Sequence, residues 1–202
     1  MVLPGLGTAT DDQPVIPGRL FVISGPSGAG KGTLIKEVLP RLRDAELAVS
    51  ATTRPMRAGE AEGREYFFLS EEDFARRVSE GDFLEHVRYG SYSYGTLRSE
   101  VEKNLATGRT LLLEIELEGA RSVRKNARDA VSIFIRPPDF EELKRRLVGR
   151  DTEDPAEIEK RLERAREELA SADEFDYIVV NDNVDRAADE LERIIIDSLK
   201  GG

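Results

Sequence analysis

The sequence predicts an α/β fold in which a parallel sheet is flanked by helices. Four short apolar runs alternate with helical patterns, which is typical of a parallel sheet whose faces are covered by helices. The runs are residues 20–24, 111–115, 131–135 and 177–180. We expect residues 19–202 to form a single domain. We expect residues 1–18, which are rich in Gly, Pro, Thr and Asp, to form a flexible tail and not a signal peptide.

The composition limits the classes of partner that this chain is expected to have. Its net charge is −10, from 40 acidic and 30 basic side chains. That balance argues against bulk binding of nucleic acid or of an anionic membrane, since both need a basic face. The chain has no cysteine, which removes disulfides, thiolate metal sites and a cysteine nucleophile. The lack of cysteine fits a reducing compartment, so we expect a cytoplasmic protein. No obligate protein partner is evident from the sequence.

The first apolar run leads into a glycine-rich loop, GPSGAGKGT, at residues 25–33, followed by a helical pattern from Leu34. A strand, such a loop and a helix in this order are typical of a P-loop NTPase-type sheet. Glycines let backbone N–H groups turn toward a phosphate, and the helix directs its positive end at the same anion. The predicted phosphate-binding residues are Gly25, Pro26, Ser27, Gly28, Ala29, Gly30, Lys31, Gly32 and Thr33.

One position in this loop departs from the usual pattern. Gly32 stands where a Ser or Thr would offer a hydroxyl to Mg²⁺, and Thr33 follows one residue later. Direct ligation of the metal by a hydroxyl is therefore left open, while the phosphate cradle is intact. The alternative for the whole loop is a glycine-rich strand-to-helix turn in which Lys31 is incidental.

A different kind of segment, residues 50–96, lies between the first two apolar runs and predicts an inserted lobe. Arg54 and Arg57 stand three positions apart in a loop that contains Pro and Gly. Two guanidinium groups at this spacing can converge on one phosphate, and tyrosine hydroxyls can complete the cup. Solvated loop charges are the alternative, but a neighbouring phosphate loop favours binding.

At this point the sequence closely resembles the guanylate kinase family, over residues 19–199. The matching stretches are GPSGAGKGT, SATTRPMRAGE, GDFLEH, YGSYSYGT, LLLEIELEG, GRDTED and IVVND. The resemblance implies transfer of the γ-phosphoryl group of ATP, bound with Mg²⁺, to GMP. We expect dGMP as a second acceptor, because none of the implied residues is an obvious reader of the 2′-hydroxyl. The implied units are a core (19–49, 97–143 and 171–202), a GMP-binding lobe (50–96) and a helical lid (144–170).

The resemblance implies two sets of acceptor contacts. Guanine presents N1–H and N2–H₂ as adjacent donors that one carboxylate can accept, so Glu85 is expected to discriminate between bases. Considered without the family, Glu85 would be an ordinary surface acid. Ser50 and Thr96 match the other guanine contacts, and the contacts to the GMP phosphate match Arg54, Arg57, Tyr66 and Tyr94.

Two carboxylates, Glu114 and Glu116, follow the apolar run at residues 111–115. Residues two apart in a strand point to the same face, so the sequence predicts both at one strand end beside the triphosphate. There Glu114, with Thr33, is a candidate for holding Mg²⁺ directly or through water. Glu116 is expected to help hold the guanine instead. A solvent-facing pair is the alternative.

The lid and the adenine side complete the resemblance. Arg146, Arg150 and Arg161 match arginines that close over ATP, while Asn181 and Asp182 match a loop that contacts the adenine. Phosphoryl transfer to a phosphate oxygen needs positioning and cations and no general base. Arg146 is expected nearer the adenine. The expected catalytic cations are Lys31, Arg54, Arg150 and Arg161.

Each of these assignments has an alternative that the sequence leaves open. Arg146 and Arg164 suit a solvated helix face, and Asn181 and Asp182 suit a turn or helix cap. Two other functions are alternatives: a binding module, as in scaffold proteins that keep this fold without catalysis, and a kinase for another phosphorylated acceptor such as a ribose bisphosphate. Lys31 argues against the first, and Ser50 with Glu85 argues against the second.

Overall fold

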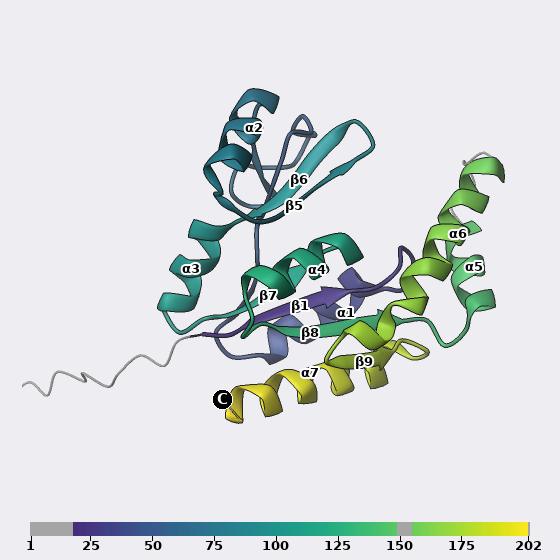
Figure 1. Ribbon diagram of the computed structural model, residues 1–202. Coiled ribbons are helices and arrows are strands. Elements are labelled where there is room, and N and C mark those ends of the chain that lie inside the picture. Colours follow the sequence, from purple (N-terminus) through teal and green to yellow (C-terminus); the bar gives the residue numbers. More distant parts are fainter. Residues whose placement is uncertain (1–17, 149–154, 202) are drawn as a thin grey trace, which may run out of the picture.

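The computed structural model describes residues 18–148 and 155–201, and its centre is a five-stranded parallel sheet (Figure 1). All four strand pairs are parallel. The α/β prediction is confirmed, and the structure adds a short edge strand whose sequence carries no strong apolar pattern. The strands in spatial order are β2 (Ala45–Leu47), β7 (Thr110–Glu114), β1 (Leu20–Ser24), β8 (Val131–Arg136) and β9 (Tyr177–Val180).

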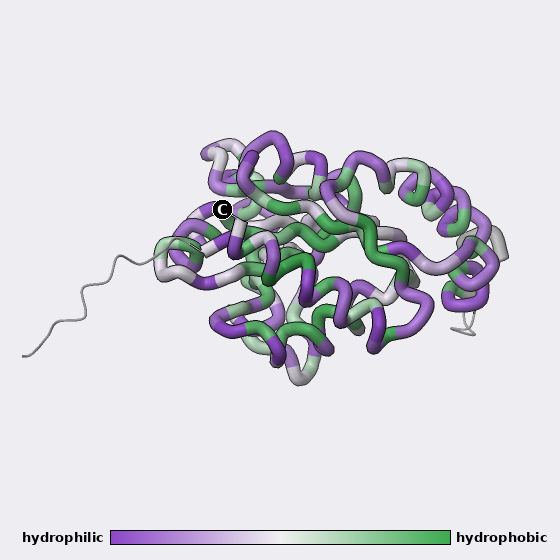
Figure 2. Tube along the Cα trace, turned by 90° about the horizontal axis from the view of Figure 1, so that it is seen from below, coloured by the Kyte–Doolittle hydropathy of each residue, from purple (hydrophilic) through white to green (hydrophobic). Residues whose placement is uncertain are grey.

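Helices cover both faces of this sheet, which explains why the central strands are apolar throughout. In β1, Phe21 and Ile23 pack against one pair of helices, while Leu20 and Val22 pack against the other. Figure 2 shows the resulting apolar interior between polar outer surfaces. None of the described helices combines the length and the apolar composition needed to cross a bilayer. The first pair is α1 (Lys31–Val38) and α7 (Val184–Lys200), and the second is α3 (Arg98–Ala106) and α4 (Leu117–Asn126).

A smaller four-stranded sheet stands beside the core, above α4 in Figure 1. Its own core is aromatic: the rings of Phe74 and Phe83 stack at 4.4 Å, and Ala51 and Leu97 close around them. This lobe rests on α4, which packs against β5. Its elements in spatial order are β4 (Tyr66–Phe68), β3 (Ser50–Thr52), β6 (Tyr92–Leu97) and β5 (Phe83–Tyr89), with α2 (Glu71–Glu80).

Two helices, α5 (Phe140–Val148) and α6 (Pro155–Ala170), project from the core at the right of Figure 1. Leu143, Leu147, Leu162 and Ala165 form their shared apolar contact. The helix α5 begins four residues before the lid boundary that the sequence predicted at residue 144. Two short 3₁₀ turns, Leu39–Arg41 and Ala172–Glu174, complete the described elements.

Two local predictions were wrong. The helix after the phosphate loop begins at Lys31 and not at Leu34, because Gly30 adopts φ 91° and so ends the loop directly at the helix. Glu116 does not share a strand with Glu114: β7 ends at Glu114, and Glu116 is the residue that precedes helix α4. The apolar residues Ile115 and Leu117 prolong the strand-like pattern past the point where the chain turns.

Candidate nucleotide-binding site

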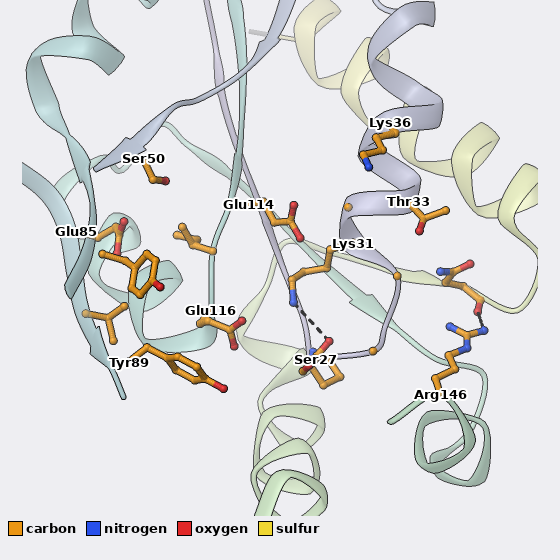
Figure 3. Close-up of a pocket in the computed structure, with 18 of the residues that line it drawn as sticks. Ser27, Lys31, Thr33, Lys36, Ser50, Glu85, Tyr89, Glu114, Glu116 and Arg146 are labelled. Atoms are coloured by element: carbon orange, nitrogen blue, oxygen red, sulfur yellow. Dashed lines mark hydrogen bonds between the residues drawn. The ribbon is translucent and has the colours of Figure 1, made fainter. Parts of the chain in front are cut away.

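A cavity of about 990 Å³ lies where the core, the four-stranded lobe and the helix α5 meet. Its volume is at the upper end of the range for ligand pockets in proteins. Figure 3 shows the phosphate loop and Lys31 in its middle, Ser50 and Glu85 at one side and Arg146 at the other. The predicted site residues that line it are Pro26, Ser27, Gly28, Gly30, Lys31, Gly32, Thr33, Ser50, Tyr66, Glu85, Tyr94, Glu114, Glu116, Arg146, Asn181 and Asp182.

Lys31 is held across the mouth of the phosphate loop. It is the first residue of α1, and its buried Nζ donates to the carbonyl of Gly25 at 2.5 Å and lies 3.4 Å from that of Pro26. The ammonium group is therefore held by backbone carbonyls of the loop itself, which are neutral acceptors. Lys31 is buried and is not a solvated surface lysine.

Asn181 and Arg146 lie together beside the same loop. The buried Asn181 side chain donates through Nδ2 to the Ala29 carbonyl at 2.8 Å, while its Oδ1 is buried and has no hydrogen-bond partner among the described residues. Arg146 donates to the Asn181 carbonyl at 3.0 Å and to Glu142 at 2.7 Å. Asp182 lines the cavity, but its carboxylate pairs with Arg186 of α7.

Glu85 is a buried carboxylate on β5, so the alternative of a surface acid is wrong. Its side chain accepts a 2.7 Å hydrogen bond from Oγ1 of Thr96, the facing residue on β6. Burial raises the pKa of the Glu85 carboxyl above its usual range, and the bond from Thr96 opposes that rise. Ser50, the first residue of β3, lines the same part of the cavity.

Arg54 is buried in the lobe and is not a solvated loop charge. Its Nη2 donates to Glu60 at 2.7 Å, and its guanidinium carbon lies 5.4 Å from the centroid of the Tyr66 ring. Glu60 also accepts from the backbone N–H of Arg57 at 2.8 Å. The bond from Arg54 lowers the pKa of the Glu60 carboxyl, and the bond from Arg57 adds to the effect. The Arg57 side chain is exposed, and the rings of Tyr66 and Tyr94 lie 6.1 Å apart.

Glu114 faces the start of α1. A Cβ atom on Gly32 would lie 3.5 Å from Oε2 of Glu114, so a carboxylate occupies the neighbourhood where a hydroxyl is usual. Burial raises the pKa of the Glu114 carboxyl, while the charge of Lys31 opposes that rise. The described residues contain no group of three or more acids or histidines arranged as a metal cage. A magnesium ion that arrives with phosphates needs only one or two carboxylates, and Glu114 fits that need.

Of the arginines that the sequence assigns to the lid, Arg146 and Arg161 are among the described residues. Arg161 on α6 donates through Nη2 to Oγ of Ser27 at 3.1 Å, which brings the lid helix to the phosphate loop. Arg150 lies outside the described residues. The sequence prediction omitted six residues that line the cavity: Lys36, Val87, Tyr89, Gly95, Ile115 and Val184. It also omitted three residues that contact site residues, namely Glu60, which pairs with Arg54, and Arg164 with its partner Glu168. Only the position of Glu60, three residues after Arg57, offered a signal.

The fold and the cavity define a P-loop phosphotransferase with a second substrate site opposite the phosphate loop. The family model described as guanylate kinase matches residues 17–198. The chain therefore belongs to the guanylate kinase family, the ATP:GMP phosphotransferases, which confirms the resemblance found in its motifs.

Individual relatives agree with this membership. The chain is 53% identical to a guanylate kinase of Synechococcus sp. over 87% of its own length and 94% of the relative. It is 50% identical to a guanylate kinase of Rubrobacter xylanophilus over 92% and 97% of the two chains. Among solved structures, a guanylate kinase from Anaplasma phagocytophilum matches with a TM-score of 0.70 and 33% identity, over 90% of this chain and 86% of the other.

Proposed function

We propose that the cavity described above transfers the γ-phosphoryl group of ATP to GMP, giving ADP and GDP. The observation that carries the proposal is that one cavity holds Lys31 in a phosphate loop and the buried carboxylate of Glu85 on the facing lobe. The first suits a triphosphate, and the second suits a base with adjacent donors. A scaffold-type binding module would have no use for the held lysine.

Recognition of the acceptor follows from the cost of burying Glu85. A buried carboxylate whose hydrogen bonds come from Thr96 alone among the described residues is poorly compensated. Guanine supplies two further donors, N1–H and N2–H₂, whereas adenine at the same place offers no such pair and would leave the carboxylate unpaired. Ser50 and Thr96 support the same edge of the base. No assigned side chain depends on the 2′-hydroxyl, so dGMP is expected to be a substrate.

For the transfer step, the protein has to position the two nucleotides and neutralise the charge of the transferred phosphoryl group. The GMP phosphate is an anionic nucleophile, so its oxygen attacks the γ-phosphorus while the bond to the ADP oxygen breaks, and no proton has to be removed. Lys31, Arg54 and Arg161 would neutralise the charge spread over the transferred group, and Arg150 stays a further prediction of that kind. Arg57, Tyr66 and Tyr94 would hold the GMP phosphate.

The donor site is supported by an unsatisfied acceptor. Oδ1 of Asn181 is buried and accepts no hydrogen bond from the described residues, and the exocyclic amino group of adenine is a donor that would satisfy it. Arg146, fixed on the Asn181 carbonyl, offers a guanidinium plane on which the adenine could stack. Asp182 remains a candidate contact on the same loop.

Magnesium fits the donor set through Glu114 and Thr33. When bound with ATP, Mg²⁺ neutralises and orients phosphate oxygens. The side chain of Glu114 would hold the ion or one of its waters, and Thr33 offers a hydroxyl in the first turn of α1. We expect this enzyme to work in the cytoplasm.

A coupled assay of ADP release tests this function. With ATP and Mg²⁺, GMP and dGMP should support turnover, whereas AMP, CMP and UMP should not. The variant Lys31→Ala should lose at least about a hundredfold in kcat, the size expected for loss of a transition-state cation. A folded protein that turns over none of these acceptors would overturn the assignment.

A further inference from the structure

One arginine of the lid helix touches all three parts of the molecule. On α6, Arg164 places Nη2 3.4 Å from Oε2 of Glu116, which precedes helix α4 of the core. Its Nε donates to Oε1 of Glu168 on the same helix at 3.0 Å. Its guanidinium carbon lies 5.5 Å from the centroid of the Tyr89 ring, at the end of β5 in the lobe.

The buried partner fixes where this guanidinium can lie. The side chain of Glu168 is only 6% exposed. Burial raises the pKa of its carboxyl, the nearby charge of Glu116 raises it further, and the bond from Arg164 lowers it. Two carboxylates thus share one cation. Removing Arg164 would leave the two carboxylates facing each other with only the charge of Lys31 acting on Glu168, and Glu116, which is partly exposed, is the one free to turn away.

The neighbouring arginines of α6 contact other residues, so the contact with Glu116 is specific to Arg164. Arg161, one turn earlier, reaches Ser27 in the phosphate loop. Arg166 lies over the Phe140 ring at 4.6 Å and so packs the two lid helices together. Only Arg164, among the described residues of α6, is seen to contact a carboxylate that lines the acceptor side of the cavity.

We propose that Arg164 is a positioning residue for GMP: it holds the Glu116 carboxylate at the guanine side of the cavity and ties the lid helix to it. The inference rests on the proposed function, in which Glu116 helps hold the base. Arg164 acts through Glu116 and touches neither reactant. The ion pair between Arg164 and Glu116 links GMP binding to the position of α6, because both depend on where the Glu116 carboxylate lies.

The test is a double-mutant cycle of Arg164→Gln and Glu116→Gln, read as KM for GMP, KM for ATP and kcat. Arg164→Gln should raise KM for GMP about fivefold, in the range of coupling between contacting residues, with KM for ATP and kcat within about twofold. In the Glu116→Gln background the same change should have no further effect. Arg76→Gln is the matched control, because Arg76 also pairs with two acids, Asp73 and Glu80, on the exposed helix α2.

Two results would overturn the inference while leaving the function intact. One is an unchanged KM for GMP in Arg164→Gln. The other is a double variant whose fold-change in KM for GMP equals the product of the fold-changes in the two single variants, which would mean that the two residues act independently. If Arg164→Gln does not fold, as judged by circular dichroism, Arg164→Lys replaces it. A lysine keeps the charge but cannot bridge both acids with a planar fork, so it should give a smaller rise in KM. Failure of the wild type to form GDP would instead overturn the proposed function.

Discussion

A Cβ atom on Gly119 would lie 2.8 Å from Oε2 of Glu85. Gly119 sits in helix α4 of the core, and Glu85 sits on β5 of the lobe. The missing side chain on α4 is therefore what gives the buried carboxylate its place. Gly119 is the third residue of α4, and glycine is a weaker helix former than alanine, so the space beside Glu85 comes at some cost in helix propensity.

Gly119→Ala should separate stability from recognition. The added methyl group improves helix propensity by up to about 1 kcal/mol but forces the Glu85 carboxylate to move. We expect a melting temperature equal to or above that of the wild type, together with a KM for GMP raised about tenfold. Thermal melting and steady-state kinetics measure the two effects. The control is Ser122→Ala, a substitution of a half-buried residue of the same helix α4. An unchanged KM in Gly119→Ala would contradict the account.

The raised pKa of Glu85 predicts that this carboxyl lowers the stability of the folded protein as pH rises. A carboxyl with a lowered pKa would have the opposite effect. In the folded protein the Glu85 carboxyl keeps its proton to a higher pH than in the unfolded chain. Its ionisation therefore costs stability as pH rises above the ordinary carboxyl range, and the cost is fully present above the folded pKa. The melting temperature of Glu85→Gln relative to wild type should increase from pH 4 to pH 8. A constant difference across this range would show that the carboxyl is not perturbed.

Glu60 should behave in the opposite way. Arg54 lowers the pKa of this carboxyl, so its stabilising contribution is present above the unfolded pKa and is lost as pH falls through the lowered folded value. Glu60→Gln should therefore melt below the wild type at pH 7, and the two should converge in strong acid. Because Gln cannot pair as an anion with Arg54, KM for GMP should rise about threefold. Glu65→Gln, which removes an exposed ion pair with Arg64, is the control.

Gly32→Ser tests how the site manages without the usual hydroxyl. The new Cβ would make an ordinary 3.5 Å contact with Glu114, and no positive φ opposes the change. A serine hydroxyl beside that carboxylate should tighten divalent metal binding in the presence of ADP about threefold. Electron paramagnetic resonance of Mn²⁺ measures this binding without turnover. Weaker Mn²⁺ binding in a folded Gly32→Ser variant would show that the glycine is required at the metal site.

The sequence predicted best those features that are formed by residues adjacent in the chain. The phosphate loop could be recognised because its residues are adjacent in the chain, and the apolar strands because both faces of the sheet are buried. Glu85 could be named only through the family, since its burial depends on Thr96, 11 residues away, and on α4. The Arg164 contact gave no signal, because an arginine in a charged helix looks the same whether it faces solvent or a distant carboxylate. The strand assumption for Glu116 failed because periodicity does not show where a strand ends.

The stoichiometry of the products tests the central claim most directly. Wild-type protein is incubated with ATP, Mg²⁺ and GMP, and ADP and GDP are quantified by mass spectrometry, with Lys31→Ala as the control. Transfer between the two sites of one cavity predicts equal amounts of ADP and GDP, and neither product above background with Lys31→Ala. ADP without GDP would mean that the phosphate loop hydrolyses ATP and that the Glu85 side of the cavity does not present GMP to it.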